Sequence, residues 1–274
     1  MQLTVLGCRG GMPANGQPSS GYLVDSGRNK FLLDCGPGIA TALSDEFDAS
    51  VLDAVIISHL HVDHCYDLLP LGKTLLSPLA LAHYPGAETA PAGPPAELPM
   101  VPLYVPAGSR SMLDTWASLL TIETMPLLDR VFDGAFDVRE YEAGDTFTVG
   151  DSTFEMVGLK HAKTNCGTRV TTPSGSLAYT GDTGVCDGLV RLADGMDLLL
   201  AEASLERTDL GAHGHLCAAD AARAAARGNV GELMLTHFPS NDDVWLKARL
   251  AEAVELFPRR VHLATPGARI TVGA

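Results

Sequence analysis

The stretch SHLHVDHCYD, residues 58–67, constrains this chain more than any other part of its sequence. It follows four apolar residues, which predict a buried strand that ends at the cluster. His59 and His61 are two residues apart on extended chain, so both side chains point to one side and can hold one divalent metal ion. Asp63 and His64, in the turn that follows, can face a second ion. Four ligand-type residues are costly to bury without a partner, so the cluster predicts a metal site rather than a solvated turn.

Composition indicates a soluble protein with one core. The chain has 274 residues, of which 46% are hydrophobic and 19% charged, an ordinary balance for a globular domain. We expect a single domain over residues 1–274, with a loop or flap rich in Pro, Ala and Gly at about residues 83–99. The formal net charge of -14 argues against long nucleic acids as partners, because they bind to basic surfaces. Small anions held by metal ions stay possible partners.

We expect neither a membrane helix nor a signal peptide in this sequence. No apolar run is long enough for a membrane helix, and the first residues, QLTVLGC, have the pattern of a strand rather than of a signal peptide. We therefore expect a cytoplasmic protein that does not bind membranes. Its six cysteines stand singly without a CxxC pair, which predicts reduced and mostly buried thiols. Cys65 follows His64 directly, and a packing role suits it better than metal binding.

Apolar patterns and turn signals divide the chain into strands and helices. The expected strands are residues 2–6, 22–25, 30–34, 54–57, 101–105, 136–142, 146–149 and 153–159. The expected helices are residues 68–79, broken near Pro78; residues 109–120, after a serine cap; and residues 242–257, with an apolar stripe packed on a sheet. The glycine-rich loop GCRGGMPANGQPSSG could border the active site or only connect two strands, and both interpretations stay open.

A second set of polar side chains stands where apolar strands end, and it comprises His161 after FEMVGLK, Asp182 after SLAYTG, Glu202 after DLLLA and His237 after ELMLT. Singly, Asp182 could cap a helix and His237 could be a core histidine. The recurrence instead favours one shared site, because binding groups gather at strand ends in sheets that helices cover. Asp34, which ends the apolar run FLLD, must accept hydrogen bonds from backbone amides of the glycine turn that follows it or support a metal ligand.

These motifs, in this order, resemble those of the metallo-β-lactamase superfamily, and the resemblance runs from about residue 2 to residue 272. It implies an α/β fold, an αββα sandwich of two mixed β-sheets flanked by helices. It also implies two divalent metal ions, for which imidazole and carboxylate ligands suit zinc best and also admit manganese or iron. The resemblance assigns one ion to His59, His61 and His161, the other to Asp63, His64 and His237, and Asp182 as the bridge between them.

A narrower resemblance comes from Glu202 in LLLAEASL and His215 in HGHLCAADAARAA. The pair is similar to one in the ribonuclease Z branch of phosphodiesterases, which implies that His215 is the general acid for the leaving alcohol and Glu202 its partner. A carboxylate partner raises the pKa of a histidine toward the operating pH. We also expect Asp63 to be catalytic, because it would bind the second metal ion and activity would be lost without it. The neighbouring His213 is interpreted as a residue of a surface loop.

Ribonuclease Z itself is disfavoured, because 20 residues between His161 and Asp182 leave no space for the arm with which that family grips tRNA. The remaining match, from VLGCRGG to LLLAEASL, resembles the atypical class II cyclic-nucleotide phosphodiesterases of actinobacteria and bacilli. This resemblance implies a compact homodimeric enzyme that opens 3′,5′-cyclic AMP or a related small phosphodiester. A hydroxide that bridges the two ions would be the nucleophile.

Other functions stay open beside this one. They are a ribonuclease Z-like tRNA 3′-processing endonuclease, a metallo-hydrolase of a thioester or lactone, a redox enzyme with a single iron, and a non-catalytic binding module. An ester hydrolase would not need the pair of Glu202 and His215, and a redox enzyme would not need a second set of ligands. The basic residues Lys160, Lys163 and Arg169 could face a phosphate or be solvated charges at a strand edge.

Overall fold

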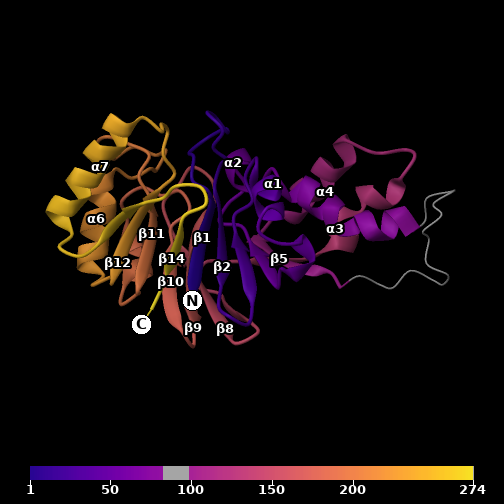
Figure 1. Cartoon of the computed structure of the whole chain (residues 1–274), viewed down its shortest axis with the longest axis horizontal. Helices are drawn as coiled ribbons and strands as arrows, with labels where there is room; N and C mark the ends of the chain where they lie inside the picture. The colour runs from indigo at the N-terminus through magenta and orange to yellow at the C-terminus, as the bar shows by residue number, and fades with distance from the viewer. Residues whose placement is uncertain (83–98, 274) are drawn as a thin grey trace.

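The computed structural model describes residues 1–82 and 99–273, which form two β-sheets packed face to face with helices on the outside (Figure 1). The αββα sandwich of mixed sheets that the motifs predict is confirmed. The predicted flap at residues 83–99 lies, apart from its last residue, outside the described residues. No helix within the described residues combines the length and the apolar character needed to cross a membrane.

Each sheet has seven strands. In both sheets one half has three antiparallel pairings and the other half has three parallel ones. The first sheet has the spatial order β14 (Arg269–Thr271), β1 (Gln2–Gly7), β2 (Gly21–Asp25), β3 (Lys30–Leu33), β4 (Ala54–Ile56), β5 (Val101–Pro106) and β6 (Phe136–Tyr141). The second has the order β13 (Val261–Leu263), β12 (Glu232–Thr236), β11 (Leu198–Glu202), β10 (Gly175–Tyr179), β9 (Cys166–Thr172), β8 (Ser152–Gly158) and β7 (Thr146–Val149).

Two sets of helices cover the outer faces, as the two sides of Figure 1 show. Those of the first sheet are α1 (Ile39–Ser44), α2 (Val62–Cys65), α3 (Leu68–Ala82) and α4 (Arg110–Leu119), with the short turns η1 (Ala49–Val51), η2 (Pro126–Asp129) and η3 (Val131–Ala135). Those of the second are α5 (Asp187–Ala193), α6 (Ala218–Arg227) and α7 (Asp243–Leu256). Because both faces of the sheets are covered, the parallel strands are continuous apolar runs such as LLLAE in β11.

Aromatic rings fill the space between the two sheets. Phe31 of the first sheet meets Phe154 of the second edge to face, with ring centroids 5.0 Å apart. Tyr22 and Tyr179 form a second pair across the interface, at 5.1 Å. Phe147 stacks on Phe154 at 5.1 Å and extends the cluster toward the edge of the sandwich. The main core of the protein is therefore the contact between the sheets.

Three predicted details of the helices are wrong. Helix α3 continues through Pro78, because Leu76 and Ala80 on either side are only 1% and 2% exposed and their burial outweighs one lost backbone hydrogen bond. The hydroxyl of Ser109 donates to the carbonyl of Pro106 and does not cap α4. In α7 the predicted stripe does not pack throughout, since Val254 is 53% exposed.

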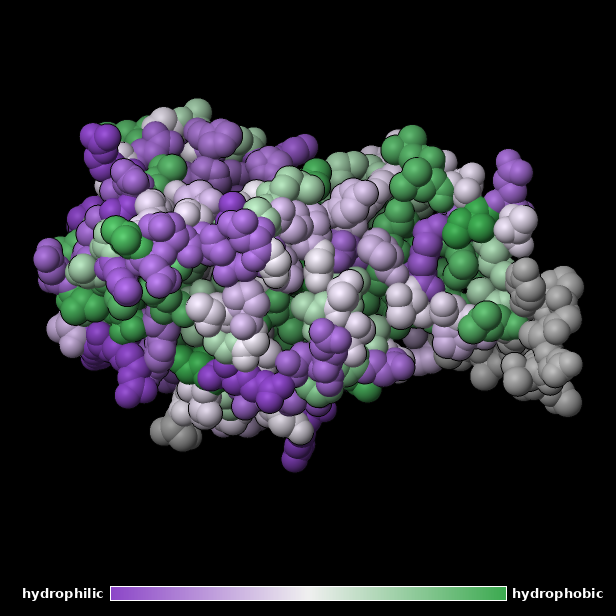
Figure 2. Space-filling model, turned by 45° about the horizontal axis from the view of Figure 1, so that its top comes forward, coloured by the Kyte–Doolittle hydropathy of each residue, from purple (hydrophilic) through white to green (hydrophobic). Residues whose placement is uncertain are grey.

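The surface beside α4 is unusually apolar. Figure 2 shows hydrophobic residues gathered in the right half of the view, over the part of the molecule that holds α3 and α4. A groove of about 300 Å³ lies between α2 and α4 and is lined by Leu60, Val62, Cys65, Tyr66, Met112, Thr115, Trp116 and Leu119. Two of its residues, Leu60 and Val62, flank His61, so the groove adjoins the histidine cluster.

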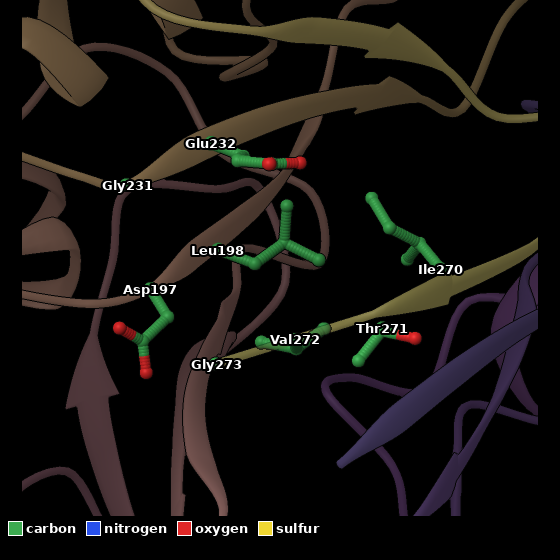
Figure 3. Close-up of a pocket in the computed structure, with 8 residues that line it drawn as sticks. All are labelled: Asp197, Leu198, Gly231, Glu232, Ile270, Thr271, Val272 and Gly273. Carbon is green, nitrogen blue, oxygen red and sulfur yellow. The ribbon is translucent and has the colours of Figure 1, made fainter.

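A different cavity lies at the opposite end of the second sheet. Figure 3 shows its eight lining residues, which come from the starts of β11 and β12 and from the C-terminal strand β14. Its volume is about 310 Å³. Its two carboxylates already have partners, because Asp197 accepts hydrogen bonds from Ser176 and Glu232 pairs with His262. Since the predicted site residues follow the ends of these strands, this cavity is remote from them.

Replacing Phe154 with alanine should test the importance of the interface between the sheets. The side chain is fully buried between two other rings, so we expect Phe154→Ala to lower the free energy of unfolding by about 3–5 kcal/mol. Urea unfolding followed by circular dichroism measures the change. Val254→Ala on the exposed side of α7 is the matched control and should cost less than about 0.5 kcal/mol. Equal effects of the two substitutions would contradict this account of the core.

Candidate metal centre

The predicted site residues converge at one edge of the sandwich, where β4, β8, β10, β11 and β12 end. Their side chains form three overlapping groups that could hold a metal ion; one consists of Asp182, Glu202, His215 and His237, and the other two are the predicted ligand sets. Of these two, the first group contains His59, His61, His161 and Asp182, and the second group contains Asp63, His64, Asp182 and His237. These are the sets that the sequence predicts for the two ions. The structure thus brings together all seven predicted ligands.

In the first group, three histidine nitrogens face one another. His61 Nδ1 lies 3.0 Å from His59 Nε2 and 3.1 Å from His161 Nε2. Asp182 Oδ2 completes the group at 3.7 Å from His59 Nε2 and 3.9 Å from His161 Nε2. His59 and Asp182 are buried, whereas the other two residues are only partly covered. The His161 side chain itself is 0% exposed, so the group is open to solvent on the side of His61.

In the second group, His64 Nε2 and His237 Nε2 lie 3.2 Å apart. Asp182 Oδ1 is 3.3 Å from each of them, and Asp63 Oδ2 is 3.2 Å from His237 Nε2. Asp182 thus turns one carboxylate oxygen to each group, as a bridging ligand must. Burial raises the pKa of Asp182, but the nearby imidazoles of His237 and His64 outweigh burial and hold the pKa well below its ordinary value. The carboxylate is therefore ionised.

The donor atoms fit divalent metal ions. Asp182 Oδ1 is buried and accepts no hydrogen bond from the described residues, and it lies 3.3 Å from two imidazole nitrogens, so a cation could take the place of a donor. On a tetrahedral ion with Zn–N bonds of about 2.0–2.1 Å, two nitrogens would lie about 3.3 Å apart, close to the separations in both groups. Nitrogen and carboxylate ligands suit zinc, and manganese or iron is compatible.

Hydrogen bonds behind the histidines fix which ring nitrogen faces each group. His64 Nδ1 lies 2.7 Å from Asp34 Oδ2 and His161 Nδ1 lies 2.9 Å from the carbonyl of Gly214. His59 Nδ1 lies 3.1 Å from the hydroxyl of Ser58. A carboxylate and a carbonyl can only accept, so in His64 and His161 Nδ1 carries the proton and Nε2 keeps a lone pair toward the group.

Asp34 is the principal support of these histidines. Besides His64, it accepts hydrogen bonds from the backbone amide of Ser58 at 2.7 Å, from the Ser58 hydroxyl at 2.8 Å and from the Tyr179 hydroxyl at 2.5 Å. The residue is fully buried and has a left-handed backbone with φ 59°, which costs energy in a residue with a side chain. Of the two roles open to Asp34 in the sequence, the structure shows support of a neighbouring histidine.

The glycine-rich loop after β1 borders the site. The Gly11 amide donates to Asp63 Oδ2 at 2.8 Å and so orients this carboxylate. A side chain at position 10 would meet His237, since a Cβ built on Gly10 lies 2.9 Å from the His237 carbonyl and 3.0 Å from Nδ1. Glycine is required there because the loop backbone packs directly on a site histidine. The interpretation as a mere connection is wrong.

Beside the second group lies the predicted pair of Glu202 and His215. His215 Nδ1 is 3.0 Å from Glu202 Oε1, and Glu202 is fully buried. Burial lowers the pKa of His215, but the hydrogen bond and the charge of Glu202 outweigh it and raise the pKa to about 9. His215 is therefore protonated at neutral pH. Its ring centroid lies 5.2 Å from that of exposed His213, so the predicted surface loop forms the rim of the site.

Three other expectations are settled by the contacts. Arg169 does not face a phosphate, because its guanidinium donates to the carbonyls of Arg191, Leu192 and Asp194 at the end of α5 and pairs with Glu155. Its charge compensates the carbonyl end of that helix. Cys65 donates to the His61 carbonyl, and burial raises its pKa to about 12, so it is a packed thiol. Asp182 does not cap a helix, since α5 begins after Cys186.

Sequence reasoning missed four residues that position the site. Ser58, Tyr179 and Ser204 donate to the buried carboxylates, and Asn165 Nδ2 donates to the carbonyls of Thr180 and Asp182, which holds the loop of the bridging residue. Each is a single polar residue, and no spacing distinguishes it from the other serines, tyrosines and asparagines of the chain. The one available signal was adjacency, because Ser58 and Ser204 stand within two residues of a predicted site residue.

Replacing Asp34 with asparagine should weaken metal binding without touching a ligand. An amide has one acceptor oxygen where the carboxylate has two, so Asp34→Asn cannot accept from Ser58, Tyr179 and His64 together. We expect the affinity for zinc to fall about 10- to 100-fold, measured by competition with a chelator. The control is Asp53→Asn, whose carboxylate accepts from the Lys30 amide outside the site. Unchanged zinc affinity in Asp34→Asn would show that the hydrogen bonds of Asp34 do not orient the ligands.

Comparisons with known proteins agree with this geometry. An uncharacterized protein of Mycobacterium tuberculosis, Rv1339, is 35% identical over 274 residues, which covers 96% of this chain and 89% of that protein. The probable metallo-hydrolase YhfI of Bacillus subtilis is 30% identical over 242 residues, 87% of each chain. Its crystal structure matches with a TM-score of 0.79 and 27% identity over 98% of both chains. A ribonuclease Z of Azobacteroides pseudotrichonymphae is 29% identical over 285 residues, 95% of each chain.

The family described as Beta-lactamase superfamily domain matches residues 29–238, a span that contains every residue of the two groups and the pair of Glu202 and His215. The match covers most of the chain and agrees with the fold and with the relatives. The chain therefore belongs to the β-lactamase superfamily and is an enzyme of its metallo-hydrolase type.

Proposed function

We propose that this chain is a dinuclear, metal-dependent phosphodiesterase that hydrolyses a small phosphodiester, 3′,5′-cyclic AMP or a related cyclic nucleotide. The observation that carries the proposal is the pair of Glu202 and His215 beside the second group. Hydrolysis of a phosphodiester expels an alkoxide, which leaves poorly without a proton. A protonated histidine at the rim of a metal site supplies that proton.

The chain's own residues would hold the ions and deliver the proton. Zinc or manganese bound by the two groups would supply positive charge to the phosphoryl oxygens and lower the pKa of a water molecule. Glu202 orients His215, and the Thr183 amide in turn orients Glu202 by donating to Oε1 at 2.6 Å. As water attacks phosphorus and the bond to the leaving oxygen breaks, His215 gives its proton to that oxygen. A cyclic nucleotide would thereby become a single mononucleotide.

The surroundings of the site support a small substrate. The 20 residues between His161 and Asp182 form β9, β10 and short connections, so no arm projects from this part of the chain. The net charge of -14 disfavours a long polyanion. The apolar groove beside His61, at about 300 Å³, offers a surface for an aromatic group such as a nucleobase. Together these features favour a nucleotide over a tRNA.

The alternatives are a ribonuclease Z-like tRNA 3′-processing endonuclease and a metallo-hydrolase of a thioester or lactone. The first is favoured by the sequence similarity to ribonuclease Z, and the second needs the metal groups but no general acid for a good leaving group. The solved structure of yeast PDE1, with a TM-score of 0.67 at 12% identity, supports the fold alone. A cytoplasmic location and a homodimer stay predictions, and light scattering would measure the oligomeric state.

The direct test is hydrolysis of a set of substrates by zinc- or manganese-loaded protein. We expect turnover of 3′,5′-cyclic AMP and of bis-p-nitrophenyl phosphate, no processing of a precursor tRNA, and loss of both activities in Asp63→Ala. Product formation is followed by chromatography, with a check that the variant is folded. Turnover of bis-p-nitrophenyl phosphate alone would overturn the cyclic nucleotide as substrate, and processing of tRNA would favour the endonuclease.

Removing His215 should affect substrates according to their leaving group. His215→Ala should lower kcat about 10²- to 10⁴-fold for 3′,5′-cyclic AMP, whose leaving alkoxide needs a proton. The loss should be below about 10-fold for bis-p-nitrophenyl phosphate, because p-nitrophenolate leaves without one. His213→Ala is the matched control, since His213 lies beside His215 whereas, among the described residues, it is His215 that bonds to Glu202. Equal losses on both substrates would exclude His215 as the general acid.

The pH profile should report the influence of Glu202 on His215. The pKa of His215 is raised to about 9, so the acid form persists through neutral pH and kcat/KM for cyclic AMP should fall as the pH rises past about 9. Glu202→Gln keeps the acceptor for the Thr183 amide but removes the charge that raises this pKa. The alkaline limb should then move toward the ordinary histidine pKa of 6.5. A limb that stays in place in Glu202→Gln would contradict the assigned pair.

A further inference from the structure

Ser204 stands between the general-acid pair and the second metal group. It lies two residues beyond Glu202, the last residue of β11, and its side chain is partly buried. Its hydroxyl oxygen is 2.6 Å from Glu202 Oε2 and 2.8 Å from His237 Nδ1. It is also 3.1 Å from the His237 carbonyl. One hydroxyl thus contacts a residue of each functional unit.

The single hydroxyl hydrogen of Ser204 has to be assigned to one of these partners. Glu202 is fully buried and offers the shortest of the contacts, so the hydroxyl donates to Glu202 Oε2. The Ser204 oxygen is then left to accept, and the proton at 2.8 Å must come from His237 Nδ1. His237 is thereby held in the tautomer whose Nε2 is free.

The free Nε2 is the nitrogen that the second group requires. It lies 3.2 Å from Asp63 Oδ2, 3.3 Å from Asp182 Oδ1 and 3.2 Å from His64 Nε2. His237 also has a left-handed backbone, at φ 59°. A change of tautomer would put a proton where a metal ion has to bind.

We propose that Ser204 is a positioning residue that serves both functional units: it holds Glu202 against His215 and fixes His237 as an Nε2 ligand of the second metal ion. The role of Ser204 toward Glu202 and His215 rests on the proposed function. Its role toward His237 rests on the metal groups. Glu202, Ser204 and His237 form one chain of hydrogen bonds. Binding of the second ion and placement of the general acid therefore depend on the same hydroxyl.

Ser58 provides an internal comparison, because it makes the same arrangement in the first group. Its hydroxyl donates to Asp34 Oδ2 at 2.8 Å and lies 3.1 Å from His59 Nδ1. Asp34, however, supports only a histidine and a tyrosine, whereas Glu202 also binds the general acid. Loss of the Ser58 hydroxyl should therefore weaken metal binding alone. Loss of the Ser204 hydroxyl should weaken metal binding and proton transfer together.

The experiment compares Ser204→Ala, Ser204→Thr and Ser58→Ala with the unchanged full-length protein. Zinc binding is measured by calorimetry of metal-free protein, and the histidine tautomers by long-range proton–nitrogen NMR of the zinc-loaded form. In Ser204→Ala we expect the weaker of the two zinc affinities to fall about 10- to 100-fold and His237 to lose its single tautomer. Ser204→Thr keeps the hydroxyl and should restore both.

Kinetics provide the second measurement. The ratio of kcat for cyclic AMP to kcat for bis-p-nitrophenyl phosphate, taken at saturating zinc, should fall at least about 10-fold in Ser204→Ala and stay unchanged in Ser58→Ala. A fall of that ratio in both variants would overturn the separate role of Ser204. Zinc affinities within twofold of the unchanged protein would overturn its role at the metal group.

The unchanged protein alone provides a test that does not depend on the folding of any variant. Its spectrum must show His237 protonated at Nδ1, and a proton at Nε2 or zinc bound through Nδ1 would overturn the assignment. Zinc affinity and tautomer are read without substrate. A protein that hydrolyses no phosphodiester but shows the expected changes in Ser204→Ala would therefore contradict the proposed function and leave the positioning role at the metal group intact.

Discussion

The structure of this site depends on one buried charge, the carboxylate of Asp182. It is ionised in surroundings that exclude water, and such a charge is tolerated only when opposite charge or hydrogen bonds compensate it. One of its oxygens has no hydrogen-bond donor among the described residues. The imidazoles of His64 and His237 each lie 3.3 Å from this oxygen, and their positive charge holds the pKa of Asp182 low. Metal ions bound in the two groups would compensate the same charge, at the point where the strands that carry the ligands end.

The sequence predicts those site residues whose positions follow a regular pattern along the chain. His59 and His61 alternate on extended chain, and His161, Asp182 and His237 each follow an apolar strand, so the period of the strands places them at one edge. The same apolar strands also predict the sandwich of two sheets. The supports could not be found in this way. Ser58, Ser204, Tyr179 and Asn165 act through contacts between segments 15 to 145 residues apart, or through one hydroxyl next to a ligand. Their roles exist only once the sheets are packed.

The errors have a common cause, which is that tertiary burial outweighs local preference. Pro78 lies inside α3 because the residues around it are buried, and Arg169 turns away from the site because a helix end offers three carbonyls. In α7 the buried positions include Arg249, whose guanidinium lies over the Trp245 ring at 5.1 Å, where an apolar stripe was expected. Sequence patterns report what a segment could bury, and the neighbouring elements decide what it does bury.

Each sheet contributes two residues to each group, and this has a consequence for folding. His61 and His161 are 100 residues apart in the chain, and Asp63 and His237 are 174 apart. An ion held by such residues closes a long loop across the interface of the sheets, much as a disulfide does, and for a loop of about 100 residues that effect is worth about 4–5 kcal/mol. At the opposite end of the sandwich the C-terminal strand β14 joins β1 and lies along the starts of β11 and β12. The catalytic ions would therefore also be cross-links of the fold. Substitutions at their ligands should lower the stability of the protein as well as its activity.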